Sequence, residues 1–212
     1  MDFDGVIARK DTLGGFLREH LARTPWMVPS FLAATWALVP LIGLPATRSR
    51  GLRLLLRAGF VGLSHDRYRE RAAAFGRELA ERPDALLPQG VAAAREHLAA
   101  GDRVVVVTGC EETLARAVLD AAGLEDVELI ASQIGPTLLG IAFEVHAYGP
   151  RKVQELRERG IEPPWAVAYS DSAADLPMLR GADEAVLVNV GARSGAGARR
   201  VLAGRVRDVV WR

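Results

Sequence analysis

The chain of 212 residues has little cysteine and almost no excess charge. Its one cysteine, Cys110, excludes an internal disulfide and fits a reducing compartment. Lys and Arg number 27 against 26 Asp and Glu, and a formal net charge of +1 gives no general electrostatic case for binding nucleic acid. Acidic residues stand where a secretory signal would have its basic and apolar regions, so we expect none. Half of the residues are hydrophobic, which excludes a disordered chain.

One stretch lacks charge altogether. From Thr24 to Thr47 there is no charged residue, and residues 26–44 read WMVPSFLAATWALVPLIGL. As a helix this run would reach roughly 28 Å, about the thickness of the hydrocarbon core of a bilayer. It contains or borders three prolines, which argue against one straight span: Pro29, Pro40 and Pro45.

A basic cluster follows this apolar run within ten residues: Arg48, Arg50, Arg53 and Arg57. Such a cluster suits an anionic membrane surface. We therefore expect segment 26–44 to associate with a membrane. A pair of helices buried inside the protein is the alternative interpretation.

The C-terminal half alternates between strand and helix patterns. Apolar runs of strand length occupy residues 103–107, 127–131, 165–169 and 185–188. Helical patterns separate them at residues 113–122 and 150–159 and from residue 176, and residues 138–145 predict a hairpin or flap. This alternation predicts an α/β fold with a doubly wound, Rossmann-like parallel sheet.

The N-terminal half has almost no strand signal and predicts helices, at residues 13–23, 67–82 and 90–99. We expect residues 1–10 and 86–212 to form the catalytic core. Residues 11–85, with the apolar segment 26–44, are expected to form a helical cap inserted after the first acidic motif.

The first strand of this sheet is expected to be truncated. Only Met1 precedes Asp2, whereas a strand of such a sheet should supply four or five apolar residues there. Either the true start lies upstream, which we favour, or the central strand is a stub. The loss of a central strand leaves ladder groups unpaired, at a cost of several kcal/mol.

Acidic residues stand at two predicted strand ends. Asp2 and Asp4 are two residues apart, so their side chains point to the same side of an extended chain, and Gly5 permits a turn after them. Asp171 and Asp175 follow the strand at 165–169. Because the carboxyl ends of parallel strands meet at one edge of the sheet, we expect these carboxylates to lie together. Taken singly, an Asp-x-Asp-Gly turn or an N-capping Asp is more often structural.

Three further residues complete a site for phosphate. Thr108 ends the strand at 103–107, and its hydroxyl, with the amides that begin at Gly109, can bind a phosphate oxygen at a helix N-terminus. Lys152 begins a helix and can neutralise both Asp2 and the phosphate, with Arg151 as the rival candidate. Cys110 is expected to be a packing residue, because no histidine near it in the sequence would activate the thiol.

The complete set predicts hydrolysis of a phosphomonoester. Asp2 is the expected nucleophile and forms an aspartyl-phosphate, while Asp4 protonates the leaving group and then accepts a proton from water. Asp2, the main-chain carbonyl of Asp4, and Asp171 can bind Mg²⁺, which prefers one or two carboxylates completed by water and phosphate. Asp175 is expected to support these ligands or Lys152 from behind.

In their order, these motifs resemble those of the haloacid dehalogenase superfamily of phosphatases, in its phosphoserine-phosphatase-like branch. The chain is most similar to the bacterial phosphatidylglycerophosphatase C type, in the stretches GGFLR at 14–18, LIASQI at 129–134, GPRKV at 149–153 and YSDSAADLPML at 169–179. The resemblance implies an Mg²⁺-dependent phosphatase of a lipid phosphate, phosphatidylglycerophosphate, at the cytoplasmic face of the inner membrane or in the cytoplasm. The chain departs from the family at Val6, where Thr is usual, and at Cys110, where Ser is usual.

Two other functions stay open. A soluble phosphatase of phosphoserine or a similar small polar monoester would fold the apolar run inside its cap. A non-catalytic binding protein would keep the fold alone, but the retention of every acidic residue in the set argues against it.

Overall fold

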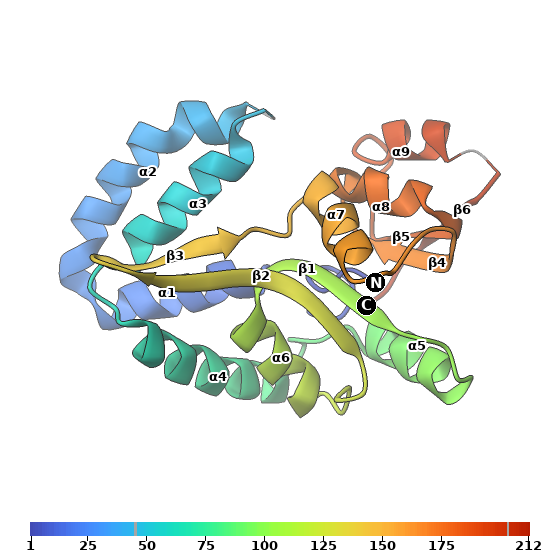
Figure 1. The fold of residues 1–212 in the computed structure, drawn as a ribbon, viewed down its shortest axis with the longest axis horizontal. Coiled ribbons are helices and arrows are strands. Elements are labelled where there is room, and N and C mark those ends of the chain that lie inside the picture. The colour runs from blue at the N-terminus through green and yellow to red at the C-terminus, as the bar shows by residue number, and fades with distance from the viewer. Residues whose placement is uncertain (45, 203) are drawn as a thin grey trace.

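Two three-stranded sheets form the centre of the computed structural model, which describes residues 1–44, 46–202 and 204–212 (Figure 1). The first sheet contains β1 (Val105–Glu111), β2 (Glu128–Thr137) and β3 (Gly140–Val145), and the second contains β4 (Trp165–Ser170), β5 (Ala182–Val188) and β6 (Val206–Val209). The pairs β1–β2, β4–β5 and β5–β6 are parallel, and β2–β3 is an antiparallel hairpin. The predicted α/β fold with a parallel sheet is therefore confirmed, and so is the hairpin at 138–145.

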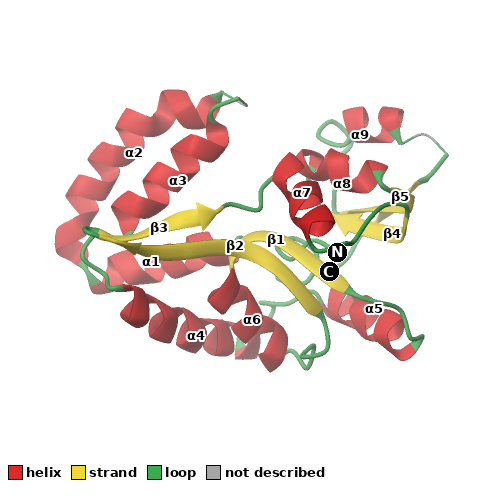
Figure 2. Cartoon of the chain, in the orientation of Figure 1, coloured by secondary structure: helices red, strands yellow, loops and turns green. Residues whose placement is uncertain are grey.

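In the C-terminal part of the chain, helices alternate with the strands; Figure 2 colours the helices red and the strands yellow. These helices are α5 (Pro88–Ala99), α6 (Glu112–Ala121), α7 (Pro150–Glu158), α8 (Leu176–Arg180) and α9 (Ala196–Val201). Successive side chains of β1 point to opposite faces of the sheet and belong to two different cores. Val106 packs in the core that contains Leu114 of α6, whereas Val107 packs in the core that contains Leu156 of α7. Strand β6 was not predicted, because Arg207 and Asp208 interrupt its apolar pattern.

The N-terminal helices are α1 (Thr12–Arg23), α2 (Val28–Gly43), α3 (Arg48–Gly59) and α4 (His65–Glu81). They are not a separate layer throughout, because α4 packs along α6 and shares the core of the first sheet. Four aromatic rings with centroids 5.1–5.5 Å apart fill this junction: Phe16, Phe60, Tyr68 and Phe75. The α2–α3 hairpin projects from this base (Figure 1, upper left).

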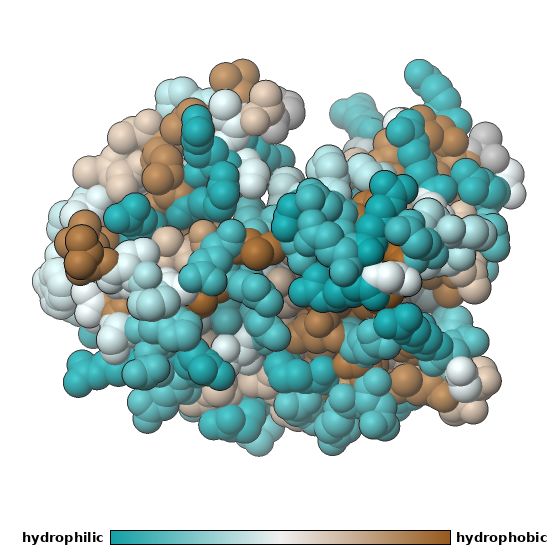
Figure 3. Space-filling model, viewed as in Figure 1, coloured by the Kyte–Doolittle hydropathy of each residue, from teal (hydrophilic) through white to brown (hydrophobic). Residues whose placement is uncertain are grey.

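Most of the charge-free run forms α2, which continues through Pro40. The expectation that this proline would interrupt the helix is therefore wrong. Pro29 stands in the first turn, where a missing N–H costs nothing, and Pro45 lies outside the described residues. Every residue of α2 is at least partly exposed, with Trp36 77% exposed. Figure 3 shows apolar atoms gathered over this hairpin. The alternative of a buried helix pair therefore does not describe this structure.

Among the described residues, Pro25–Gly43 is the one helical span long and apolar enough to cross a membrane, with 6% of it buried. The criterion for such a span uses only length and composition, and the core helix of a soluble protein or a signal sequence also satisfies it. The span follows directly on α1, which carries site residues at its first turn.

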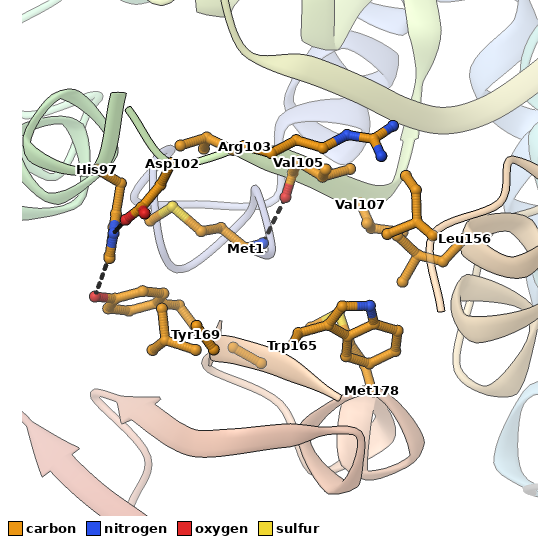
Figure 4. A pocket seen from close by; sticks show the side chains of 15 residues that line it. Met1, His97, Asp102, Arg103, Val105, Val107, Leu156, Trp165, Tyr169 and Met178 are labelled. Atoms are coloured by element: carbon orange, nitrogen blue, oxygen red, sulfur yellow. Dashed lines mark hydrogen bonds and ion pairs between the residues drawn. The ribbon is translucent and has the colours of Figure 1, made fainter. Parts of the chain in front are cut away.

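The N-terminal residues join the two sheets. The Met1 amine donates to the carbonyl of Val105 at 2.6 Å, and the Val107 N–H donates to the carbonyl of Met1 at 2.8 Å. On the other side, the Asp2 N–H donates to the carbonyl of Tyr169 at 2.9 Å. Figure 4 shows Met1 in the apolar pocket between β1 and β4, where His97 bonds the Tyr169 hydroxyl at 3.0 Å. Met1 and Asp2 thus pair like the end of a central strand, which places Asp2 at the carboxyl ends of β1 and β4.

Candidate active site

One pocket contains every residue predicted from the sequence to take part in catalysis, phosphate binding or metal binding. Asp2, Asp4, Thr108, Gly109, Lys152, Asp171 and Asp175 all line it. Figure 3 shows the surface hollowed between the α2–α3 hairpin and the side of the molecule that carries α7 to α9. Residues up to 173 positions apart in the chain meet here because the N-terminal segment lies between the ends of β1 and β4.

Lys152 lies between two carboxylates. Its Nζ donates to Asp2 Oδ1 and to Asp175 Oδ2, each at 2.8 Å, and the Ser170 hydroxyl donates to Asp175 Oδ2 at the same distance. Burial alone would lower the pKa of Lys152, but the charges of Asp2 and Asp175 outweigh it and raise the pKa above its ordinary value. Lys152 therefore stays charged although it is buried. Arg151, the rival candidate, instead pairs with Glu155 and Glu158 of its own helix.

Asp2 presents one oxygen to its neighbours and one to the pocket. The N–H of Phe3 and the ammonium of Lys152 both donate to Oδ1, each at 2.8 Å, and among the described residues no hydrogen bond reaches Oδ2. Burial raises the pKa of Asp2 well above its usual value, although Lys152 opposes this. Burial would raise the pKa of Asp175, but the charge of Lys152 together with the hydrogen bonds to Asp175 outweighs burial and lowers it. By its hydrogen bonds, Asp2 is the member of this pair that is held through one oxygen while the other accepts no bond from the described residues.

Asp4 is held by a residue that was not predicted from the sequence. Thr12, the first residue of α1, donates its N–H at 2.9 Å and its hydroxyl at 2.7 Å to Asp4 Oδ1. Burial raises the pKa of Asp4 to about 6, while the two bonds from Thr12 limit the rise. A carboxyl group with a pKa near 6 can give up and take back a proton near neutral pH. The only sequence signal for Thr12 was its position at a helix start.

The Thr108–Cys110 loop differs from the expectation in one respect. These residues lie within β1 and not at a free helix N-terminus. The first N–H groups of α6 are already bonded, because the Glu111 side chain accepts those of Thr113 and Leu114 at 2.9 and 3.1 Å. The Thr108 hydroxyl accepts the Cys110 N–H at 3.0 Å. The groups of this segment that are available to bind a phosphate are thus the Thr108 hydroxyl and the main chain at Gly109.

Ser132, from the LIASQI stretch, supports this loop from β2. Its hydroxyl donates to the carbonyl of Gly109 at 2.8 Å and accepts the N–H of Ala147 at 3.1 Å. It therefore ties the loop to the segment that leads into α7. In the sequence Ser132 directly follows the predicted strand at 127–131, and no pattern marks it as part of a site. Cys110 is buried, and burial raises the pKa of its thiol well above the usual value, as a packing residue requires.

Asp171 approaches the turn after Asp4 closely. A Cβ on Gly5, which has φ +76°, would lie 2.1 Å from Asp171 Oδ2, so only glycine leaves room for this carboxylate. Burial, and then the charge of Asp175, raises the pKa of Asp171. Four carboxyl groups thus line one pocket, and the buried ammonium of Lys152 bonds two of them, Asp2 and Asp175; a divalent cation bound there would offset further negative charge.

The donor set at this point fits Mg²⁺. Among the described residues, no three His, Cys, Asp or Glu side chains form a metal-binding group. A hard cation of this size needs fewer side chains, because it is held by one or two carboxylates together with carbonyl oxygen, water and substrate phosphate. Asp2, Asp171 and the main-chain carbonyl of Asp4 are the groups that would hold it.

Beyond the predicted site residues, much of the pocket wall is apolar or aromatic, while Arg9, Lys10 and Asp11 also line it. Leucines from α1 and α3 form one side: Leu13, Leu17, Leu52, Leu55 and Leu56. Three rings from β3 and the segment after it form another: Phe143, His146 and Tyr148. A substrate whose phosphate reaches Asp2 therefore has an apolar surface beside its remaining part.

Comparison with known proteins agrees with this geometry. No curated protein matches the sequence significantly. A solved protein of unknown function from Bordetella pertussis Tohama I has a TM-score of 0.73 at 20% identity, covering 98% of this chain and 95% of its own. A phosphoserine phosphohydrolase-like protein from Francisella tularensis subsp. tularensis SCHU S4 has a TM-score of 0.62 at 13% identity, and the match covers 97% of this chain and 92% of that protein. A substrate-bound phosphoserine phosphatase has a TM-score of 0.61 at 16% identity, and the match covers 97% of this chain and 96% of that protein. These likenesses show the fold.

The family itself is shown by the sequence. The family described as haloacid dehalogenase-like hydrolase matches residues 1–180, which contain all seven predicted site residues. The chain is therefore a hydrolase that belongs to the haloacid dehalogenase-like family.

Proposed function

We propose that this hydrolase is an Mg²⁺-dependent phosphomonoesterase that acts through an aspartyl-phosphate on Asp2. The observation that carries the proposal is the arrangement of Asp2, which is fixed through Oδ1 by Phe3 and Lys152 while Oδ2 faces the pocket. A solved phosphoserine phosphatase with a phospho-aspartyl intermediate analogue has the same fold, with a TM-score of 0.57 at 15% identity.

In the first half-reaction, Asp2 Oδ2 attacks phosphorus and the bond from phosphorus to the alcohol oxygen breaks. The electron pair leaves with that oxygen, which takes the proton of Asp4. The Lys152 ammonium and the Thr108 hydroxyl stabilise the negative charge of the phosphoryl oxygens. The alcohol is released and Asp2 carries the phosphoryl group.

In the second half-reaction, the Asp4 carboxylate takes a proton from water, and the water oxygen attacks phosphorus. The bond between Asp2 and phosphorus breaks, which regenerates the Asp2 carboxylate and releases inorganic phosphate. Asp4 is left protonated for the next cycle. When bound by Asp2, Asp171 and the Asp4 carbonyl, Mg²⁺ would neutralise phosphoryl charge.

We further propose that the substrate is a lipid phosphate such as phosphatidylglycerophosphate. Two observations support this substrate class. Leucines of α1 and α3 form one side of the pocket wall, and the segment 26–44, which contains α2, exposes Trp26, Leu32, Trp36, Val39 and Leu44. Acyl chains would remain in lipid while the phosphate reaches Asp2.

The four arginines of α3 are exposed and would contact an anionic membrane surface. In this arrangement, the hairpin docks at the cytoplasmic face of the inner membrane. Residues 11–85 then act as a membrane-binding cap over the core formed by 1–10 and 86–212. The aromatic cluster that the cap shares with the core holds the hairpin in a fixed position relative to the catalytic residues.

A soluble phosphatase of phosphoserine is the second candidate. The phosphoserine phosphatase relatives of the same fold favour it. A small polar substrate needs charged or polar groups around its amino and carboxylate ends. Arg9, Lys10 and Asp11 line this pocket and could meet such ends, but the leucines of its wall and the exposed apolar residues of the hairpin suit a lipid better, and for this reason we place the lipid phosphate first.

The chemistry is tested by acid quench after mixing the enzyme with a ³²P-labelled aryl phosphate. We expect transient label on the protein, lost with Asp2→Asn, and turnover that EDTA abolishes and Mg²⁺ restores. Turnover by Asp2→Asn at the wild-type rate would contradict the nucleophile, and turnover undiminished by EDTA would contradict the metal.

A further inference from the structure

His146 lies on the segment that joins β3 to α7 and lines the same pocket as Asp2. Its ring is stacked between Phe143, with centroids 4.7 Å apart and planes at 14°, and Tyr148, with centroids 5.6 Å apart and planes at 19°. The stack fixes the plane of the imidazole, so each ring nitrogen has a defined direction.

The two nitrogens of His146 lie beside different parts of the molecule. Nδ1 is 3.0 Å from the Ser49 hydroxyl oxygen on α3. Nε2 is 4.0 Å from the position that a Cβ would take on Gly109, and among the described residues no hydrogen bond reaches it. His146 therefore contacts the α2–α3 hairpin with one nitrogen and faces the phosphate-binding loop with the other.

The ring is neutral at physiological pH. Burial, and then the charge of Arg53, lowers the pKa of His146 to about 4. A neutral imidazole has one donor nitrogen and one acceptor nitrogen. If the Ser49 hydroxyl donates to Nδ1, the proton is on Nε2, which is then a donor directed to the pocket.

The position of Nε2 decides which part of a substrate it meets. The phosphoryl group already has Lys152, Thr108 and the bound cation as its partners in the proposed mechanism. His146 belongs to the aromatic side of the pocket wall and is linked through Ser49 to α3 of the hairpin. A substrate whose phosphate is bound by Lys152 and Thr108 would extend its alcohol along this wall.

We propose that His146 is a specificity-determining residue, which donates a hydrogen bond from Nε2 to an oxygen in the alcohol portion of the phosphomonoester while Ser49 fixes its tautomer. The inference rests on the proposed phosphomonoesterase function and extends it to substrate choice. It selects alcohols with a hydroxyl or ester oxygen close to the phosphate, with apolar groups beyond it against the leucine wall.

The test compares glycerol 3-phosphate with n-propyl phosphate, which has the same three-carbon chain without hydroxyls. In His146→Phe the aromatic stack is kept and the donor is lost, so kcat/KM for glycerol 3-phosphate relative to n-propyl phosphate should fall about tenfold, mainly through KM. His146→Gln, which retains an N–H donor, should recover part of this ratio, and Ser49→Ala should lower it less than His146→Phe does.

Equal losses for the two esters, or an unchanged ratio, would overturn the assignment, because a purely structural role or a contact to phosphate affects both substrates alike. Failure of the proposed function gives a different result: the wild-type chain would then hydrolyse neither ester nor an aryl phosphate. The two failures are therefore separable on one preparation.

Discussion

Thr12 donates two hydrogen bonds to one oxygen of Asp4, from its N–H at 2.9 Å and from its hydroxyl at 2.7 Å. The first turn of α1 thus sets both the orientation and the proton affinity of the residue that we propose as acid and base. It also links the catalytic carboxyl to the helix that leads into the α2–α3 hairpin.

The pH profile of kcat/KM should report Asp4. The first half-reaction needs Asp4 protonated, and its pKa is raised to about 6, so this step should slow as pH rises through that value. Thr12→Val removes a bond that stabilises the carboxylate, so the pKa rises further and the falling limb moves to higher pH. Thr12→Ser retains the hydroxyl and should keep the wild-type limb. A limb that stays in place or moves to lower pH in Thr12→Val would contradict this role for Thr12.

Asp4→Asn should slow both half-reactions by roughly 100-fold or more, because one group supplies the proton and later removes one. Rapid-quench kinetics separate the burst of alcohol from the decay of the phosphoenzyme. An ester of a strongly acidic phenol, which needs no protonation, should recover the burst but not the decay. Unchanged rates for both steps would remove Asp4 from the mechanism.

Lys152→Met should destabilise the fold by about 3–5 kcal/mol near pH 7, because it leaves the buried carboxylates of Asp2 and Asp175 without their cation. The cost should shrink as pH falls, since protonation removes the unpaired charges. Urea unfolding measures the free energy of unfolding at each pH. The double variant Asp2→Asn/Lys152→Met should lose less than the sum of the single losses. A pH-independent cost with additive losses would show that Lys152 contributes by packing alone.

The exposed face of α2 should carry membrane binding. Trp36→Asp places a charge where the side chain is 77% exposed and should weaken binding to anionic vesicles about tenfold. Val210→Asp is the matched control, an apolar residue 76% exposed beyond β6. High salt should weaken wild-type binding only in part, because salt screens the arginines and not the apolar contact. Equal binding by Trp36→Asp and wild type in a flotation assay would exclude this face.

The sequence predicted the alternating core well, because buried parallel strands are continuous apolar runs such as residues 103–107. It also predicted which acidic residues meet, because strand order places their carboxyl ends at one edge. Thr12 and Ser132 could not be predicted, since each acts through hydrogen bonds to residues outside its own element and carries no local sequence pattern. The cap on α6 by Glu111 is local, but Glu is not among the residues typical of a helix N-cap, and β6 was missed because charges on an edge strand hide its alternation.

The central claim is that the α2–α3 hairpin presents a lipid phosphate to Asp2, and the most direct measurement compares two substrates on one preparation of the full chain. With Mg²⁺, kcat/KM is measured for phosphatidylglycerophosphate in anionic vesicles and for phosphoserine in solution. We expect the lipid phosphate to be preferred by at least about 100-fold, with the preference reduced in Trp36→Asp. A chain that stays off the vesicles and prefers phosphoserine would contradict the lipid assignment while leaving the aspartyl-phosphate chemistry in place.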